Sequence, residues 1–278
     1  MRTLCLAGIV ALAAAGHPQD TAPGVETIMS RVGLNQAKSQ DARANWLYTQ
    51  KQFLRALRPS GKVAREERRE YLVEPAGRSV KKELTHFEGH YQQHGRLISY
   101  DHPGLHYQGL DLDGDLIDDM SRDMLDDSRA RDGIGRDLFP LSYYQQLKYT
   151  FRLLGSEPHL GRTVYRVGFE PKRGEGADWK GEALIDAAEF QPVSIATTSA
   201  LKIPLLVKTL LGTDIKGLGF SLSYEKFAEG VWFPVSYGGE FEVRGVFFYR
   251  RTFTISMTNR DFRKADVSSH IRYAEEQP

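Results

Sequence analysis

The sequence predicts a mainly β protein made of consecutive antiparallel strands. Three stretches support this fold class, residues 44–95, 146–198 and 216–273, because apolar and polar residues alternate in each and turn residues mark the breaks. In the central stretch, Val167 and Phe169 belong to an apolar stripe that would lie on one face of a sheet. A sheet of this size has two faces. We expect the function to depend on the face that does not simply pack into the hydrophobic core.

Two other segments predict helices. Residues 24–46 carry apolar residues at helical spacing, which predicts an amphipathic helix packed on the sheet; the alternative is a helix that covers an apolar cavity and can move. Residues 203–211 are strongly apolar, with Pro204 near the start and Gly212 just after the end, as at the two ends of a helix. This segment is either buried against the sheet or a flap over an apolar cleft.

The N-terminus has the layout of a cleavable secretory signal. A basic start at Arg2 is followed by an apolar run too short to cross a bilayer and by an Ala-rich exit. We therefore expect residues 1–18 to be removed and residues 19–278 to form a single domain of a soluble exported protein. The only cysteine, Cys5, lies within the signal, so the mature chain would have no disulfide, thiolate metal site or cysteine nucleophile. No later segment predicts a transmembrane helix.

The charge pattern argues against a nucleic-acid partner. The formal net charge is +1, so the sequence has no basic excess of the kind that phosphate backbones attract. One predicted strand carries six consecutive charged residues, from Arg65 to Glu70. Because the signs are mixed, we interpret this run as a solvated strand or a protected sheet edge rather than as a binding patch.

Histidines form the first candidate metal site. His86, His90 and His94 are spaced by four, which places them on one face of a helix or of a strand, and imidazole nitrogens bind zinc or copper. The alternative is a solvent-facing hairpin, because Gly89 interrupts the segment and the stretch after His94 resembles a turn into a strand.

Aspartates form the second candidate metal site. Asp111, Asp113 and Asp115 alternate around a glycine, as in a calcium loop, in which several oxygens converge on one cation. The match is partial, because Arg122 stands where such a loop has glutamate. The alternative is a helix that begins near Asp115, since aspartate favours the cap and first turn of a helix.

Catalytic motifs are missing from the sequence. It contains no G-x-S-x-G elbow, no H-E-x-x-H motif and no P-loop, so we expect neither an enzyme nor a bound cofactor.

Several short motifs resemble periplasmic LolA/LolB-like and RseB-like proteins, which include outer-membrane lipoprotein-sorting proteins. The motifs are Leu154-Gly155, Glu157, Gly161-Arg162, Val164-Tyr165, Val167, Phe169, Pro171, Ile185-Asp186, Pro192 and residues 230–234. The resemblance implies a strongly curved antiparallel sheet, an incomplete barrel, whose concave apolar face is covered by a few helices and accepts acyl chains. The Asp-rich segment at about residues 111–137 departs from this pattern and is interpreted as an insert.

A lipid-binding role also has a physical basis, because each methylene buried in an apolar cavity contributes about 0.8 kcal/mol. We therefore favour a periplasmic carrier or sensor of acyl chains of lipids or lipoproteins, with an envelope protein as a second kind of partner. The alternatives are an envelope protein-interaction module with a filled interior and a metal-dependent enzyme. The candidate cavity residues are Tyr149, Phe151, Tyr165, Val167, Phe169, Leu205, Leu206, Leu210, Phe220, Trp232 and Phe247.

Overall fold

The computed structural model describes residues 23–76, 79–107, 109–125, 142–173, 179–199, 214–245 and 248–265. The predicted signal at residues 1–18, the end of the Asp-rich segment from residue 126 and the apolar segment 203–211 lie outside these ranges. No helix in the described ranges is both long and apolar enough to span a membrane.

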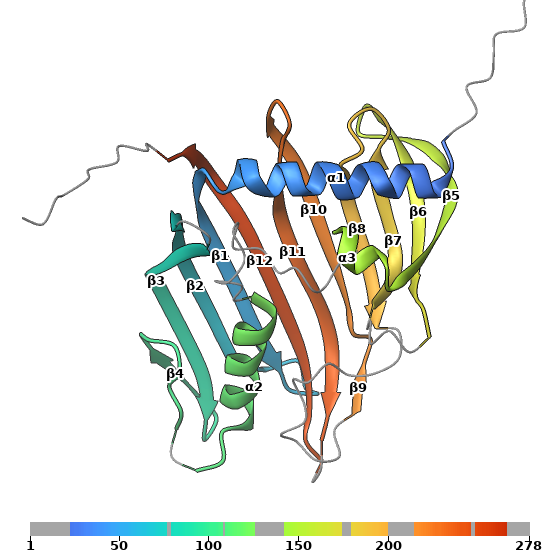
Figure 1. The fold of residues 1–278 in the computed structure, drawn as a ribbon. Helices are drawn as coiled ribbons and strands as arrows, with labels where there is room; N and C mark the ends of the chain where they lie inside the picture. The colour runs from blue at the N-terminus through green and yellow to red at the C-terminus, as the bar shows by residue number, and fades with distance from the viewer. Residues whose placement is uncertain are drawn as a thin grey trace, which may run out of the picture.

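Two meanders and a C-terminal group of strands make up one antiparallel sheet (Figure 1). The N-terminal meander contains β1 (Trp46–Leu57), β2 (Val63–Ala76), β3 (Ser79–Gln93) and β4 (Arg96–Tyr100). The central meander contains β5 (Tyr149–His159), β6 (Arg162–Pro171), β7 (Trp179–Asp186) and β8 (Pro192–Ser199). The remaining strands are β9 (Asp214–Lys216), β10 (Gly219–Ala228), β11 (Val231–Arg244) and β12 (Arg250–Lys264). Apart from the short strands β4 and β9, these strands lie where the alternating pattern predicts them.

The last strands of the chain join the two meanders. The strand order is β4-β3-β2-β1-β12-β11-β10-β8-β7-β6-β5, with β9 paired to β11, and every pairing along this order is antiparallel. The described part of the sheet therefore ends at β4 on one side and β5 on the other, and it is not closed into a barrel. The expected curved, incomplete barrel is confirmed.

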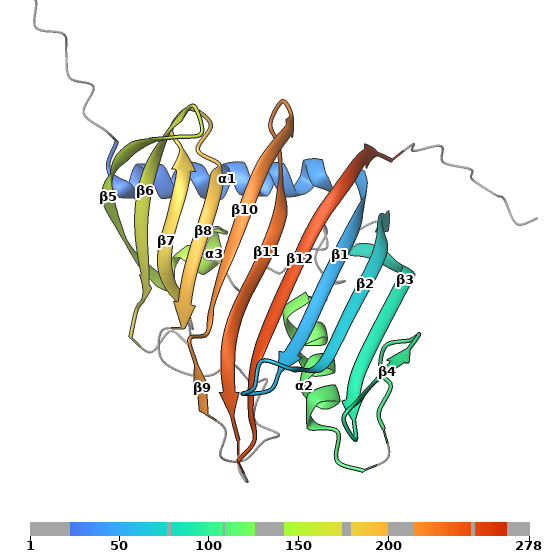
Figure 2. The same ribbon diagram turned by 180° about the vertical axis from the view of Figure 1, so that it is seen from behind.

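All described helices lie on one face of the sheet, which we call the covered face; the opposite, open face is seen in Figure 2. They are α1 (Val25–Arg43), α2 (Leu112–Met120), which continues into the π-helical turn η1 (Ser121–Leu125), and α3 (Tyr143–Gln146). Helix α1 crosses the sheet near one end of the strands, whereas α2 lies over the N-terminal meander (Figure 1).

The contacts of α1 divide it into an apolar and a polar part. Ile28 and Val32, near its start, are fully buried in the main core. Further along the helix, Gln36 donates to the Gln191 side chain at 2.7 Å, and at its end Arg43 donates to the Trp232 carbonyl oxygen at 2.8 Å. The predicted helix is confirmed, and its buried polar residues tie it to the sheet through hydrogen bonds that an exposed helix would make with water.

Candidate functional site

The covered face carries two chemically different surfaces. From β5 to β12 and β1 its buried side chains are mostly apolar, among them Tyr149, Val167, Phe169, Phe220 and Trp232, although β1 and β12 also bury the amides of Gln50, Gln52 and Asn259. We call this surface the apolar region. On β2 and the adjoining helix α2, the same face carries buried charges.

Every predicted cavity residue within the described ranges lies in or against the apolar region. Besides the five buried residues, Phe151 and Tyr165 are half-buried and pack against them. The rings contact one another, for example Trp179 with Phe220 at 5.2 Å and Phe220 with Tyr237 at 5.1 Å between centroids. The other four predicted residues, Leu205, Leu206, Leu210 and Phe247, lie outside the described ranges.

The charged run on β2 is buried on one face, so its interpretation as a solvated or edge strand is wrong. Strand β2 lies between β1 and β3 in the sheet. Because side chains alternate along a strand, Arg65, Glu67 and Arg69 point to the covered face, where they are 0%, 0% and 6% exposed. Glu66 and Arg68 point to the open face and pair with each other at 2.7 Å. The alternation that revealed the apolar stripes therefore also applies to this run of charges.

Glu67 is the centre of the buried charges. One of its carboxylate oxygens accepts from Arg65 Nε at 3.4 Å and from Tyr100 Oη at 2.5 Å, and the other accepts from Arg69 Nε at 2.8 Å. Arg65 Nε also donates to Tyr100 Oη at 2.8 Å. Two guanidinium groups and a phenol thus share one carboxylate, which satisfies charges that would otherwise be costly to bury.

Helix α2 and the residues at its two ends supply the acceptors on the opposite side. Arg65 Nη1 donates to Asp111 Oδ2 at 2.7 Å, whereas Arg69 Nη2 and Nη1 donate to Asp118 Oδ1 at 3.2 Å and Ser121 Oγ at 2.5 Å. We call the seven residues of this network the ionic cluster. Its members are Arg65, Glu67, Arg69, Tyr100, Asp111, Asp118 and Ser121.

Burial and charge shift the ionisation of this cluster. Burial, reinforced by the negative charge of Glu67, raises the pKa of Tyr100 far above its ordinary value. Burial lowers the pKa of Arg65 and Arg69, but their anionic neighbours outweigh this effect, and the net shift is upward. The arginines are therefore charged and Tyr100 is neutral at physiological pH.

The Asp-rich segment forms a capped helix instead of a calcium loop. Asp111 is the N-cap of α2, and its Oδ1 accepts from Gly114 N at 2.9 Å. The helix therefore begins at Leu112, three residues before the expected start at Asp115. Asp113 accepts from Tyr249 Oη at 2.7 Å, and the half-exposed Asp115 lies 3.4 Å from His106. Asp111 and Asp115 both lie near His106, whereas Asp113 faces Tyr249 and Arg251, so the three candidate aspartates do not converge on one point.

The candidate histidines do not cluster into a metal site either. His86 and His90 lie on β3 opposite Glu70 and Glu66, and His86 is exposed and pairs with Glu88 at 3.2 Å. His94 lies in the following turn with a φ of 49°. Within the described ranges, no group of three or more His, Cys, Asp or Glu side chains is arranged to hold a metal ion.

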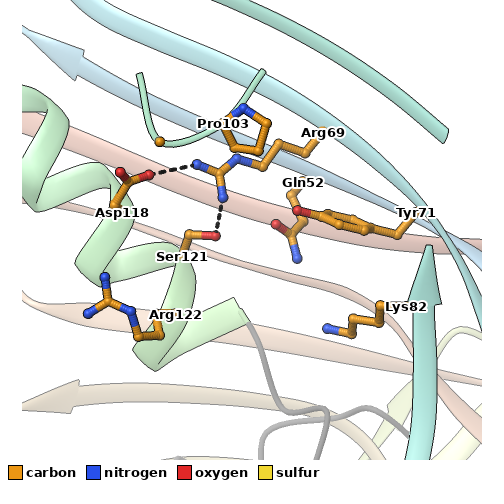
Figure 3. Close-up of a pocket in the computed structure, with 9 residues that line it drawn as sticks. Gln52, Arg69, Tyr71, Lys82, Pro103, Asp118, Ser121 and Arg122 are labelled. Atoms are coloured by element: carbon orange, nitrogen blue, oxygen red, sulfur yellow. Dashed lines mark hydrogen bonds and ion pairs between the residues drawn. The ribbon is translucent and has the colours of Figure 1, made fainter. Parts of the chain in front are cut away.

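A polar cavity of about 450 Å³ lies beside the ionic cluster, between α2 and the first three strands (Figure 3). Strands β1, β2 and β3 provide the sheet side, α2 and η1 provide the helix side, and a loop closes one end. The lining residues are Gln52, Arg69, Tyr71, Lys82, Pro103, Gly104, Asp118, Ser121 and Arg122. Its volume is within the range of about 300–1,000 Å³ that small-molecule sites occupy.

This cavity and the ionic cluster were not predicted as a site. The sequence contained one signal for them: opposite charges at positions 65, 67 and 69 alternate with the period of a strand, and an Asp-rich helix follows. A strand pattern of this kind indicates a buried ionic face when a segment of opposite charge is available to cover it.

Comparisons with known proteins give structural likenesses only. No family model matches the sequence, and no curated protein matches it. An outer membrane lipoprotein-sorting protein domain from Vibrio parahaemolyticus is 13% identical, with a TM-score of 0.33, over 86% of this chain and 94% of that chain. A LolA superfamily protein from Nitrosomonas europaea is 12% identical, with a TM-score of 0.35, over 88% of this chain and 96% of that chain.

A third similar structure comes from the MucA/MucB complex of Pseudomonas aeruginosa. It is 10% identical, with a TM-score of 0.26, over 84% of this chain and 99% of that chain. The resemblance inferred from the sequence motifs is thus confirmed as a likeness to LolA superfamily and MucB structures.

Proposed function

We propose that this protein is an exported, non-catalytic carrier or sensor that binds the acyl chains of lipids or lipoproteins on the covered face of its sheet. The observation that carries the proposal is the division of this face into an apolar region and an adjoining polar cavity. An amphipathic ligand has the same division, with an apolar chain at one end and a polar group at the other.

The two surfaces are continuous at β1 and β12. Gln52, which lines the cavity, is two residues from Leu54, and both side chains point to the covered face. In the neighbouring strand, Met257 lies opposite Gln52 and Ile255 lies opposite Leu54, and both belong to the apolar region. A ligand whose polar end occupies the cavity would therefore meet apolar side chains directly beside it.

The apolar region would supply most of the affinity. Each methylene transferred from water to an apolar surface contributes about 0.8 kcal/mol, so even a short acyl chain gains several kcal/mol. The described aromatic side chains pack against one another, so a chain enters only where side chains or a covering segment move aside. The residues we assign to this contact are the predicted cavity residues, including Phe169 and Leu206.

The alternative of an envelope protein-interaction module has the same export route and the same fold. It differs in that the apolar region stays filled by its own side chains and the partner binds elsewhere, for example at an edge strand. A bound acyl ligand would support the carrier, whereas its absence would support the interaction module.

The decisive experiment is native mass spectrometry of the protein purified from its own envelope fraction, followed by organic extraction. We expect a stoichiometric acyl-bearing ligand. We also expect Phe169→Ala to retain less of it, whereas Phe248→Ala, whose ring is fully exposed, should retain as much as the wild type. A protein that remains empty after incubation with envelope lipids and lipoproteins would contradict the proposal.

A further inference from the structure

A chain of side-chain amides fixes the orientation of one group in the polar cavity. The chain starts at the backbone carbonyl of Pro234, which can only accept and receives a hydrogen bond from Asn259 Nδ2 at 2.9 Å. The Asn259 oxygen must then face Gln50, whose Nε2 donates to it at 3.3 Å. The Gln50 oxygen in turn accepts from Gln52 Nε2 at 2.9 Å. Each amide sets the orientation of the next.

Gln52 is the last amide of this chain, and its side-chain oxygen Oε1 is not used by any of these hydrogen bonds. Its amide nitrogen is used by Gln50 and by the Leu125 carbonyl oxygen at 3.4 Å, so the two ends of the amide cannot be exchanged. Within the described part of the chain, Gln52 Oε1 is buried and has no hydrogen-bond partner. The residue is 4% exposed and lines the cavity (Figure 3). A buried acceptor without a partner is costly, and a donor on a ligand would satisfy it.

The rest of the lining favours an anion. Three cationic side chains, Arg69, Lys82 and Arg122, line the cavity together with a single carboxylate, Asp118. Lys82 Nζ donates to Gln50 Oε1 at 3.1 Å and to the Leu125 carbonyl oxygen at 3.0 Å. Its ammonium group is therefore held beside the oriented amide, within reach of a ligand that occupies the cavity.

Arg122 lies on the helix side of the same cavity. Its side chain is 65% exposed and pairs with Asp119 at 2.9 Å, so it can turn toward a ligand at little cost. Arg69, by contrast, is held by Glu67, Asp118 and Ser121, and it contributes a fixed positive charge. Figure 3 shows the cationic side chains on both the sheet side and the helix side of the space.

We propose that this cavity binds a phosphorylated polyol, with the phosphate near Lys82 and Arg122 and a polyol hydroxyl that donates to Gln52 Oε1. The inference rests on the proposed function if the polyol is the head of a lipid, in which case the acyl chains continue into the apolar region. The same chemistry is present in a free polyol phosphate. The two sources differ in whether acyl chains add affinity.

The test is isothermal titration calorimetry of the protein with three probes: glycerol, glycerol 3-phosphate and dihexanoyl phosphatidylglycerol. The variants are Lys82→Gln, Arg122→Gln and Gln52→Leu, with Lys81→Gln as the matched control. Lys81 is adjacent to Lys82 on β3, but its side chain is 62% exposed and pairs with Glu83 on the surface. Because Arg122 is exposed, its substitution tests the site even if the Lys82 variant is poorly folded.

We expect glycerol 3-phosphate to bind more tightly than glycerol. Lys82→Gln and Arg122→Gln should each weaken that binding by about tenfold or more, as for loss of a charged hydrogen bond, and Lys81→Gln should leave it unchanged. Gln52→Leu should weaken binding of both glycerol 3-phosphate and glycerol, because it removes the acceptor of the hydroxyl and leaves the charges in place.

The remaining outcomes separate this inference from the proposed function. If the lipid probe binds more tightly than glycerol 3-phosphate and both depend on Lys82, the ligand is a lipid head and both proposals stand. If only glycerol 3-phosphate binds in a Lys82-dependent way, the cavity is supported and the acyl-chain function is contradicted. If the lipid probe binds with the same affinity to all variants, the cavity assignment fails while the acyl-chain function stands. Absence of binding by both phosphate probes overturns the inference.

Discussion

The apolar region and the ionic cluster occupy the same face of the same sheet, yet they are stabilised in different ways. In the apolar region, many side chains such as Phe220 and Ile255 contribute through contacts that depend on shape and volume. In the ionic cluster, Glu67 alone accepts hydrogen bonds from Arg65, Arg69 and Tyr100. The first surface distributes its stability over many residues, whereas the second concentrates it in one carboxylate.

This difference has a consequence for ligand binding. Apolar side chains can shift past one another because their contacts are not directional, and a region of this kind adapts to chains of different length. Buried ion pairs lose much of their energy when a partner moves, so the ionic cluster holds α2 at a fixed position on β2. The polar cavity beside it is therefore the preorganised part of the proposed site, and the apolar region is the adaptable part.

The largest expected effect comes from neutralising the central carboxylate. Glu67→Gln keeps the size of the side chain but leaves Arg65 and Arg69 buried without their shared anion. We expect the free energy of unfolding to fall by about 3–5 kcal/mol, as when one partner of a buried ion pair is removed. Urea unfolding followed by circular dichroism measures this change.

Glu70→Gln is the matched control on the same strand. Glu70 lies on the open face and pairs with the exposed Lys51 at 2.9 Å, so its loss should change stability by less than about 1 kcal/mol. Equal effects of the two substitutions would show that the buried carboxylate has no special role.

The prediction of the fold succeeded where a local pattern was sufficient. Alternation and turn residues located the strands of both meanders, and helical spacing located α1 at Val25–Arg43. The position of β12 between β1 and β11 was not predictable in this way, because strand order depends on pairings between residues about 200 positions apart, such as Gln50 and Asn259.

The candidate site was predicted less well, and the reason is again physical. Apolar residues such as Phe169 reveal their burial through their own chemistry, whereas Glu67 is buried only because Arg65, Arg69 and α2 surround it. A single sequence does not show which charged residues of distant segments will pair with one another. The burial of charges therefore became visible only once β2 was placed in the middle of the sheet.

The second expected effect concerns the space that Tyr100 occupies. Gly89 lies opposite Tyr100 in the sheet, and a Cβ at Gly89 would be 2.3 Å from the Tyr100 ring. Gly89→Ala should push the ring away from Glu67 and Arg65 and lower the free energy of unfolding by about 1–3 kcal/mol. We would measure urea unfolding of Gly89→Ala, of Tyr100→Phe and of the double variant. The losses in free energy of unfolding should not add, because both substitutions act through the Tyr100 ring.

Gly168→Ala is the control for this experiment in the central meander. There a Cβ would meet only the end of the Leu154 side chain, at 3.3 Å, and a small shift of that side chain makes room. Additive effects of Gly89→Ala and Tyr100→Phe would contradict the view that the glycine acts through Tyr100.

The third expected effect is a dependence on alkaline pH that is specific to the ionic cluster. Burial and Glu67 raise the pKa of Tyr100 in the folded protein above its unfolded value of about 10. A raised pKa contributes stability that is complete below the unfolded pKa and is lost as the pH rises beyond it. Thermal unfolding should therefore show a shallower loss of stability above about pH 10 in Tyr100→Phe than in the wild type.

Tyr144→Phe serves as the comparison, because the Tyr144 ring is 80% exposed. Its profile should follow that of the wild type. A Tyr100→Phe profile as steep as the wild-type profile would assign the alkaline loss to other groups, among them Tyr249, whose pKa burial and Asp113 also raise.

The smallest expected effect tests the apolar region with an equally conservative change. Ile255 is fully buried opposite Leu54, and Ile255→Val removes one methyl group from a surface that neighbouring side chains can partly refill. We expect the free energy of unfolding to fall by only about 0.5–1.5 kcal/mol in urea. Glu67→Gln is as small a change in side-chain size as Ile255→Val. It should nevertheless lower the free energy of unfolding several times as much, because a charge has specific partners and a methyl group does not. Similar losses for the two variants would mean that the apolar region is as tightly specified as the ionic cluster, and an apolar region of that kind could not adapt to acyl chains.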